Sequence, residues 1–322
     1  MYVEIIAVLL GLVLLVYSAE RFVEGAAVSA KYAGASPLLI GMLVVGFGTS
    51  APEMMVSVFA AYEGNPNIAL GNAYGSNIIN IAFVLGLTAI LYPITVSSKI
   101  VRKELPLLLA IVLFSGWLIF DNILSLIDII LLLAGFVALI VWSVLTAKQH
   151  RSDELASDVS TELASTLMSR GRATFWLIIG LLLLLLSAKI LVWGAQSIAV
   201  KMGISDLIIG LTIIALGTSL PELAATIAAA KKGEHDIAIG NIIGSNMFNM
   251  LAVVGFSGIF GAIPVDDALV YRDWPVMLAT SLMLLVMAYG YKKLGAISRK
   301  EGGILVLSFI VYNTFLLYSI NN

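Results

Sequence analysis

Two glutamates lie inside long apolar stretches of this chain, and the same residue types precede each of them. The first copy reads Gly48-Thr49-Ser50-Ala51-Pro52-Glu53, and the second, 169 positions later, reads Gly217-Thr218-Ser219-Leu220-Pro221-Glu222. A carboxylate within a membrane is costly, which makes it a candidate functional group. Two such carboxylates, each preceded by hydroxyls, indicate a site for a positively charged substrate.

Each copy is expected to interrupt its helix. Because Pro52 has no N–H, the carbonyl of Gly48 loses its hydrogen-bond partner. A broken helix is tolerated in a membrane where the backbone lines a cavity or is buried in protein. The freed carbonyls are then available to a cation. Thr49 and Glu53 are four residues apart and share a helix face, and the second copy repeats this spacing.

A second pair of motifs provides neutral oxygens. The copies read Gly71-Asn72-Ala73-Tyr74-Gly75-Ser76-Asn77-Ile78-Ile79-Asn80 and Gly240-Asn241-Ile242-Ile243-Gly244-Ser245-Asn246-Met247-Phe248-Asn249. In each copy Asn, Ser and Asn recur every four residues and form a polar stripe on a helix. Hard cations bind such oxygens, so we expect ligands among Ser76, Asn80, Ser245 and Asn249. An all-oxygen site favours calcium or sodium over zinc or copper.

Both motif pairs also have local interpretations. The motif serines could cap the following half-helices, with the glutamates at the third helical position. The polar stripes could merely hydrogen-bond helices to one another. For the small-residue pairs, Gly71/Gly75 and Gly240/Gly244, we favour helix packing; for the carboxylates and their companions we favour ion binding.

The composition places these motifs in a membrane. The chain has 322 residues, of which 60% are hydrophobic and 12% charged, whereas soluble domains have about 25% charged residues. The absence of cysteine excludes disulfides, thiolate metal sites and a cysteine nucleophile. Hydropathy predicts an all-α polytopic membrane protein with about ten spans, at 3–24, 37–62, 67–92, 104–121, 124–146, 174–199, 205–231, 236–261, 273–291 and 302–320.

The two halves of the chain are internal repeats. At an offset of 169 residues, Ser18–Gly86 aligns with Ser187–Gly255 without a gap. Each copy would contain five spans, so the second enters the membrane from the opposite side and the repeats are inverted. We therefore predict a first five-helix repeat at 1–146, a cytoplasmic linker at 147–173 and a second, inverted repeat at 174–322.

Basic residues occur mainly in alternate loops, which predicts the orientation. Lys and Arg are enriched in cytoplasmic loops. One set of loops contains Arg21, Lys31, Lys99, Arg102, Lys103, Lys148, Arg151, Arg170, Arg172, Lys231, Lys232, Lys292, Lys293, Arg299 and Lys300, whereas the opposite set contains Lys201 and Arg272. Both termini are therefore expected on the extracytoplasmic side.

Together the two motif pairs resemble the alpha repeats of the sodium/calcium exchanger family, within the cation/calcium antiporter superfamily, and the resemblance covers nearly the whole chain. It implies ten helices in two inverted five-helix repeats, with the four motif helices at the centre and the first and sixth helices sliding across them. It also implies a multi-pass protein of a prokaryotic inner membrane that exchanges Ca²⁺ for Na⁺. Carried over by motif position, the ligands would be Thr49, Ser50, Glu53, Ser76, Asn80, Thr218, Ser219, Glu222, Ser245 and Asn249, with backbone carbonyls near Gly46 and Ala215.

The two charges give a physical reason for coupled exchange. An empty site holds up to two negative charges, each costing at least about 2.5–3.5 kcal/mol in the membrane. One Ca²⁺ or two Na⁺ would neutralise them, so the loaded forms can pass through an occluded state and the empty form resists. Alternating access would follow from motion between the repeats. Protons compete for the carboxylates, so acid is expected to inhibit.

Other functions are distinguished by specific features. The nearest alternative is a proton-coupled antiporter of Ca²⁺ or another divalent cation, although the Gly-Asn-x-x-Glu pattern of the proton/calcium branch is absent. Some relatives, potassium-dependent ones included, have Asp at the position of Asn249. An intramembrane hydrolase would need a Ser–His pair or polar dyad, but neither His150 nor His235 lies in a predicted span, so we expect no enzyme. A channel would need no counter-ion.

The expected partners are the lipid bilayer and the transported Ca²⁺ and Na⁺, without cofactor, nucleic acid or obligate protein partner.

Overall fold

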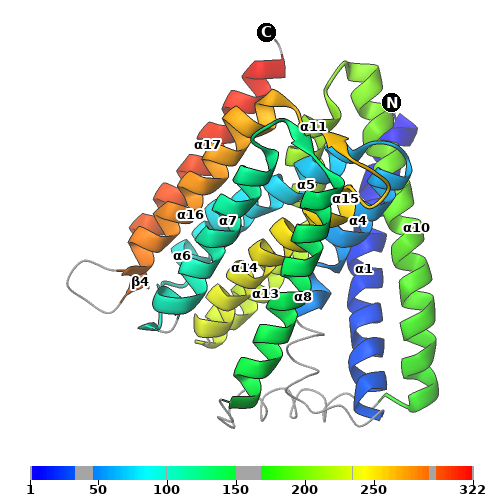
Figure 1. Ribbon diagram of the computed structural model, residues 1–322. Helices are drawn as coiled ribbons and strands as arrows, with labels where there is room; N and C mark the ends of the chain where they lie inside the picture. The colour runs from blue at the N-terminus through cyan, green and yellow to red at the C-terminus, as the bar shows by residue number, and fades with distance from the viewer. Residues whose placement is uncertain are drawn as a thin grey trace.

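The described part of the protein is almost entirely helical (Figure 1). The structure is a computed structural model that describes residues 2–32, 46–98, 100–149, 168–233, 235–289 and 295–320. The start of the second predicted span and most of the predicted linker lie outside these ranges.

The helices follow the predicted spans in order. The first half contains α1 (Tyr2–Tyr32), α3 (Gly46–Thr49), α4 (Ala51–Tyr62), α5 (Pro66–Ile78), η2 (Ile79–Leu85), α6 (Gly86–Leu91), η3 (Ile100–Glu104), α7 (Leu105–Ile119) and α8 (Leu126–Gln149). The second half contains α10 (Arg170–Met202), α11 (Asp206–Ile209), η4 (Gly210–Ile214), α12 (Ala215–Thr218), α13 (Leu220–Lys232), α14 (His235–Phe248), η5 (Asn249–Val253), α15 (Val254–Ser257), η6 (Leu269–Asp273), α16 (Trp274–Tyr289) and α17 (Arg299–Ile320). The η elements are π-helical turns.

Seven of these helical stretches are long and apolar enough to cross a membrane, and a bent pair, Asp206–Thr218 with Leu220–Lys231, adds an eighth. The two other predicted spans contain α3–α4, of which the described part begins at Gly46, and η3–α7, which carries Arg102, Lys103 and Glu104 at its start. The prediction of an all-α polytopic membrane protein is confirmed.

Contacts between the halves occur in exchanged pairs. Asn77 donates from Nδ2 to the carbonyl of Asn246 (3.2 Å), and Asn246 donates from Nδ2 to the carbonyl of Asn77 (3.3 Å). Ser18 and Ser187, which are also 169 positions apart, bring their Oγ atoms within 3.3 Å. Such reciprocal contacts are those of two copies related by a twofold axis, as inverted repeats require. Consistently, α1 begins and α17 ends at the same end of the molecule (Figure 1).

The short strands also pair between the two halves. β1 (Ile94–Thr95) pairs antiparallel with β4 (Ala296–Ile297), and β2 (Ile123–Leu124) pairs with β3 (Ile263–Pro264). Each pair therefore joins a loop of one half to a loop of the other. The division into 1–146, 147–173 and 174–322 remains a prediction.

α1 and α10 lie side by side at one edge of the molecule (Figure 1). Four glycines bring their backbones together, because a Cβ at Gly11, Gly25, Gly180 or Gly194 would lie only 2.5–3.0 Å from the partner helix. The apolar cluster around this pair also includes residues of α4 and α5, whereas a second, larger cluster joins α5, α7, α8, α14 and α16. The motif helices therefore lie between the α1–α10 pair and the rest of the bundle.

Candidate cation site

Both predicted helix interruptions are present, and both fall on a motif serine. α3 ends at Thr49 and α4 begins at Ala51, while α12 ends at Thr218 and α13 begins at Leu220. Ser50 (φ −89°, ψ 2°) and Ser219 (φ −82°, ψ 4°) have almost the same backbone conformation. The axis bends by 42° at the second interruption. The prolines that follow explain both breaks, since they favour the first turn of a new helix.

The positions of a capping box are occupied as predicted, with Ser50 and Ser219 at the N-cap and the glutamates in the first turn, but the serine capping hydrogen bonds are absent. Neither Ser50 nor Ser219 makes a side-chain hydrogen bond to the first turn of the helix that follows. Both hydroxyls are buried, with no hydrogen-bond partner among the described residues. These hydroxyls are therefore available to a ligand.

The companion motifs depart from a regular α-helix at their last residue. α5 ends at Ile78 and continues as η2, so Asn80 lies in a π-helical turn; Asn249 likewise begins η5. The predicted stripe therefore ends at the start of a π-helical turn in both copies. A π turn shifts the side chains that follow relative to an α-helix, and such turns are frequent at functional sites.

Threonines from each half contact the companion motif of the other half. Thr218 donates from Oγ1 to Asn72 Oδ1 (3.0 Å) and lies 3.5 Å from Ser76 Oγ. The exchanged pair is also present: Thr49 Oγ1 lies 3.5 Å from Asn241 Oδ1 and 3.4 Å from Ser245 Oγ. The site is therefore shared between the two repeats.

The two motif glutamates lie within this shared site. Glu53 and Glu222 are both 0% exposed, and Asn72, which accepts from Thr218, lies 3.4 Å through Nδ2 from the carbonyl oxygen of Glu53. Ser245 donates from Oγ to Glu222 Oε1 (3.3 Å), which connects Glu222 through Ser245 to Thr49. The structure thus places the predicted carboxylates and hydroxyls together, on helices from both halves.

Among the predicted side-chain ligands, seven buried oxygens have no hydrogen-bond partner within the described residues. They are Ser50 Oγ, Glu53 Oε1 and Oε2, Asn80 Oδ1, Ser219 Oγ, Glu222 Oε2 and Asn249 Oδ1. Leaving a buried polar atom unsatisfied costs about 1–3 kcal/mol, and more for a charged atom. Ca²⁺ takes about 6–8 oxygen ligands, so this set fits a hard cation. No cluster of three or more His, Cys, Asp or Glu side chains is found in the described chain.

The two predicted backbone ligands have different surroundings. The carbonyl of Ala215 accepts from Ser219 N (3.1 Å), and Thr218 Oγ1, whose one proton is directed to Asn72 Oδ1 at the shorter distance, lies 3.3 Å from it. Gly46 is the first described residue of α3. A ligand role for these two carbonyls remains a prediction.

One positioning interaction was missed by the sequence analysis. Asn80 donates from Nδ2 to Asn246 Oδ1 (3.0 Å), which leaves Asn80 Oδ1 without a partner. Asn249, the counterpart of Asn80, makes no side-chain hydrogen bond to described residues. Asn246 belongs to the companion motif, so its position in the motif was the signal that could have identified it.

The glycine pairs are only partly explained by packing. A Cβ at Gly71 would lie 2.4 Å from the carbonyl oxygen of Leu207, and one at Gly75 would lie 2.6 Å from that of Leu211. These contacts confirm close helix approach for the first pair. A Cβ at Gly240 or Gly244 would meet no described atom within 4 Å.

The fold and the arrangement of the motif residues define a helical membrane protein with a candidate cation site shared by its two halves. The family described as "Sodium/calcium exchanger protein" matches this chain at residues 3–145 and 172–318. The chain therefore belongs to the sodium/calcium exchanger family, which confirms the resemblance of the motifs.

Similar proteins cover nearly the whole chain. CaxA from Alkalimonas amylolytica is 48% identical over 320 residues, covering 99% of this chain and 100% of that protein. Inner membrane protein YrbG from Escherichia coli (strain K12) is 38% identical, covering 96% of this chain and 95% of that protein. A solved structure of the sodium-calcium exchanger NCX_Mj, soaked with 2.5 mM Na⁺ and 0.1 mM Sr²⁺, has a TM-score of 0.65 and 34% identity, covering 97% of this chain and 99% of that chain. Family and fold together support antiport of cations that include Ca²⁺.

Proposed function

We propose that this protein exchanges Ca²⁺ for Na⁺ across the membrane by alternating access at the shared site. The observation that carries the proposal is the set of seven unpartnered buried oxygens around Glu53 and Glu222. A folded protein is stable by only about 5–15 kcal/mol, so this many buried oxygens need partners, which bound cations or water would supply. Ions with two positive charges in total would compensate both the oxygens and the carboxylates.

The ligand roles follow from the chemistry of each side chain. Glu53 and Glu222 supply the negative charge, which one Ca²⁺ or two Na⁺ would neutralise. The neutral ligands are Thr49, Ser50, Ser76, Asn80, Thr218, Ser219, Ser245 and Asn249, which would replace the hydration shell. An empty site would retain unpaired charge at membrane depth, so it would resist the transition between access states and leak would be suppressed.

Sodium is the coupling ion that we favour, and proton coupling is the alternative. Support for sodium comes from the similarity to NCX_Mj, a sodium-calcium exchanger, and from the absence of the Gly-Asn-x-x-Glu pattern. The two carboxylates could also carry protons in exchange for Ca²⁺. Uptake of ⁴⁵Ca²⁺ into proteoliposomes loaded with Na⁺, K⁺ or H⁺ in turn distinguishes these couplings. Uptake driven by a pH gradient but not by a Na⁺ gradient would replace our proposal with the alternative.

We also propose an inner-membrane location with both termini on the extracytoplasmic side. The similarity to an inner membrane protein supports the location. The distribution of basic residues supports the orientation. Because the chain has no cysteine, single-cysteine variants can be labelled at one position each. Glu63→Cys should react with an impermeant maleimide added outside intact cells, and Lys300→Cys should react only after lysis. The reverse pattern would invert the topology.

A further inference from the structure

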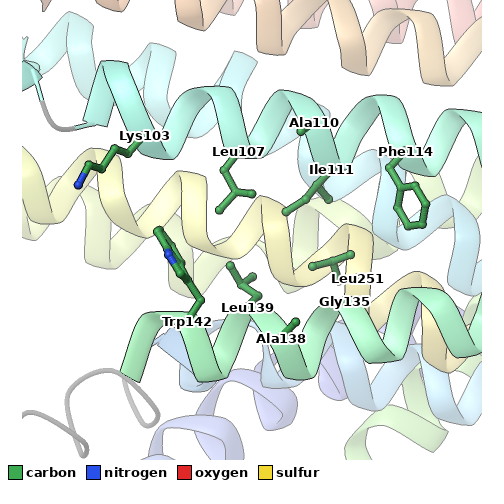
Figure 2. Close-up of a pocket in the computed structure, with 10 residues that line it drawn as sticks. All are labelled: Lys103, Leu107, Ala110, Ile111, Phe114, Gly135, Ala138, Leu139, Trp142 and Leu251. Carbon is green, nitrogen blue, oxygen red and sulfur yellow. The ribbon is translucent and has the colours of Figure 1, made fainter. Parts of the chain in front are cut away.

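A groove with a volume of ≈ 760 Å³ lies between α7 and α8, and nothing in the exchange mechanism uses it (Figure 2). Small residues on the two helices, Ala110, Gly135 and Ala138, leave the space open, and Leu251 of η5 contributes to its lining. Lys103 and Trp142 lie at the same end of the groove (Figure 2). The groove is therefore apolar along its length and carries one cationic side chain at its end.

The groove opens toward the surface of the helix bundle. Ala110 and Ala138 are exposed, and Trp142 is 42% exposed, whereas Leu139 and Leu251 are buried. From Lys103 to Phe114 the helix rises about 16 Å, which is close to half of the ~30 Å hydrocarbon core of a bilayer. Those dimensions fit one acyl chain of a single leaflet.

The second repeat shows what fills the equivalent space. Ser125 caps α8 by accepting from Asp128 N and donating to its carboxylate, and Ser298 makes the same contacts with Glu301 in α17. These two caps place α8 and α17 in register. In that register three of the four α8 residues that line the groove have larger counterparts in α17: Gly135, Ala138 and Leu139 correspond to Ser308, Val311 and Tyr312, whereas Trp142 corresponds to the smaller Phe315.

The basic residue at the end of the groove also differs in its contacts from its counterpart in the second repeat. Lys103 corresponds to Arg272, since they are 169 positions apart. Arg272 is bonded through Nε and Nη2 to the buried Asp273 (2.7 and 3.0 Å), and Tyr312 donates to the same carboxylate (2.8 Å). Within the described chain no ion pair is found for Lys103. The first repeat therefore has a smaller side chain at the position of Tyr312, and although Glu104 corresponds to Asp273, no ion pair joins it to Lys103 in the described chain.

We propose that the groove binds an anionic phospholipid, with an acyl chain between α7 and α8 and the headgroup phosphate on Lys103. Basic pockets between membrane helices are suited to such headgroups, and an indole such as that of Trp142 is favoured at the membrane interface. The site is separate from the cation site, so the proposal does not depend on which ions are exchanged.

Native mass spectrometry of the purified full-length protein, with phosphatidylglycerol or phosphatidylcholine added, tests this site. The wild type should retain one phosphatidylglycerol in preference to phosphatidylcholine. Lys103→Gln should reduce that preference about fivefold, which corresponds to the ~1 kcal/mol contributed by one basic residue at a membrane surface. Arg102→Gln is the matched control, because Arg102 is an exposed neighbour that does not line the groove.

A second variant tests the groove without changing its charge. Leu139→Tyr introduces the residue found in the second repeat and should abolish retention of the bound lipid, while the size-exclusion profile stays that of the wild type. Equal retention of both lipids by the wild type, or an equal loss in Lys103→Gln and Arg102→Gln, would overturn the headgroup assignment. Full lipid retention in Leu139→Tyr, or a dimer that excludes lipid, would overturn the groove as the binding site.

Discussion

Replacing Glu53 by glutamine should abolish Ca²⁺ exchange without weakening the fold. Neither carboxylate oxygen of Glu53 accepts a hydrogen bond from described residues, so the change removes charge and no observed hydrogen bond. A unit charge pair at ~4 Å in an effective dielectric of ~20 contributes about 4 kcal/mol. Since about 1.4 kcal/mol changes an equilibrium constant tenfold, Ca²⁺ binding should weaken roughly 10³-fold.

The same substitution removes repulsion between Glu53 and Glu222. The Glu53→Gln protein should therefore be at least as heat-stable as the wild type in the presence of a chelator. Ca²⁺ should stabilise the wild type, by about 2.7 kcal/mol at a concentration of ~100 Kd, and should leave the variant unchanged. This pattern separates loss of the site from misfolding.

The assays are ⁴⁵Ca²⁺ uptake into Na⁺-loaded proteoliposomes and thermal unfolding with and without Ca²⁺. Glu63→Gln is the control, because Glu63 is exposed and follows the C-terminus of α4. Uptake at the wild-type rate by Glu53→Gln would refute a charge-based site. So would a Ca²⁺-induced stabilisation equal to that of the wild type.

Three further predictions address protons, positioning and stability. Lowering the pH should reduce Ca²⁺ uptake, because protonation removes the negative charge that binds Ca²⁺; uptake that rises on acidification would contradict the site. Asn246→Ala should weaken Ca²⁺ binding about tenfold, since Asn80 loses the hydrogen bond that orients it and such losses cost about 1–3 kcal/mol. Ca²⁺ affinity is measured by isothermal titration calorimetry. Asn77→Ala is the control and should weaken Ca²⁺ binding less, because Asn77 contacts no proposed ligand. Arg272→Gln should lower the thermal midpoint by leaving the buried Asp273 carboxylate without its cation, a loss of about 3–5 kcal/mol, and an unchanged midpoint would contradict that ion pair.

The architecture was largely predictable because the membrane limits the possibilities. An apolar stretch of about 20 residues must be helical to satisfy its backbone in lipid, so hydropathy alone identified the helical segments. The repeat at an offset of 169 residues predicted two inverted halves, and contacts between equivalent residues, such as Ser18–Ser187 and Asn77–Asn246, are consistent with that prediction. The exact helix ends were less predictable: α1 extends to Tyr32, beyond the span predicted to end at residue 24.

The site was predictable in its residue types but not in its local geometry. A proline after a serine is enough to predict an interruption, and both interruptions occur at Ser50 and Ser219. No residue type predicts a π turn, because a π turn depends on how the helix packs against its neighbours. The orientation of Asn80 and Asn249 was therefore beyond sequence reasoning. The contacts of the Ala215 carbonyl with Ser219 N and Thr218 Oγ1 could not be predicted from the sequence either.

The hydrogen bonds indicate which parts of the molecule can move against each other. Motion between the two repeats as rigid halves would break the reciprocal bonds of Asn77 and Asn246 and the contacts of Thr218 with the first repeat. Those bonds are buried, and breaking each without replacement costs about 1–3 kcal/mol. The polar contacts of α1 and α10, by contrast, include contacts with each other, such as Ser18–Ser187 and Glu4–Lys201. The pair meets α4 through apolar side chains, and apolar contacts are non-directional. One hydrogen bond, from Gln196 Nε2 to Asn65 Oδ1 (3.1 Å), joins α10 to the residue before α5 and would have to break or move with the pair. The contacts therefore favour a sliding of the α1–α10 pair over a fixed core that holds the cation site, in place of a motion between the two repeats.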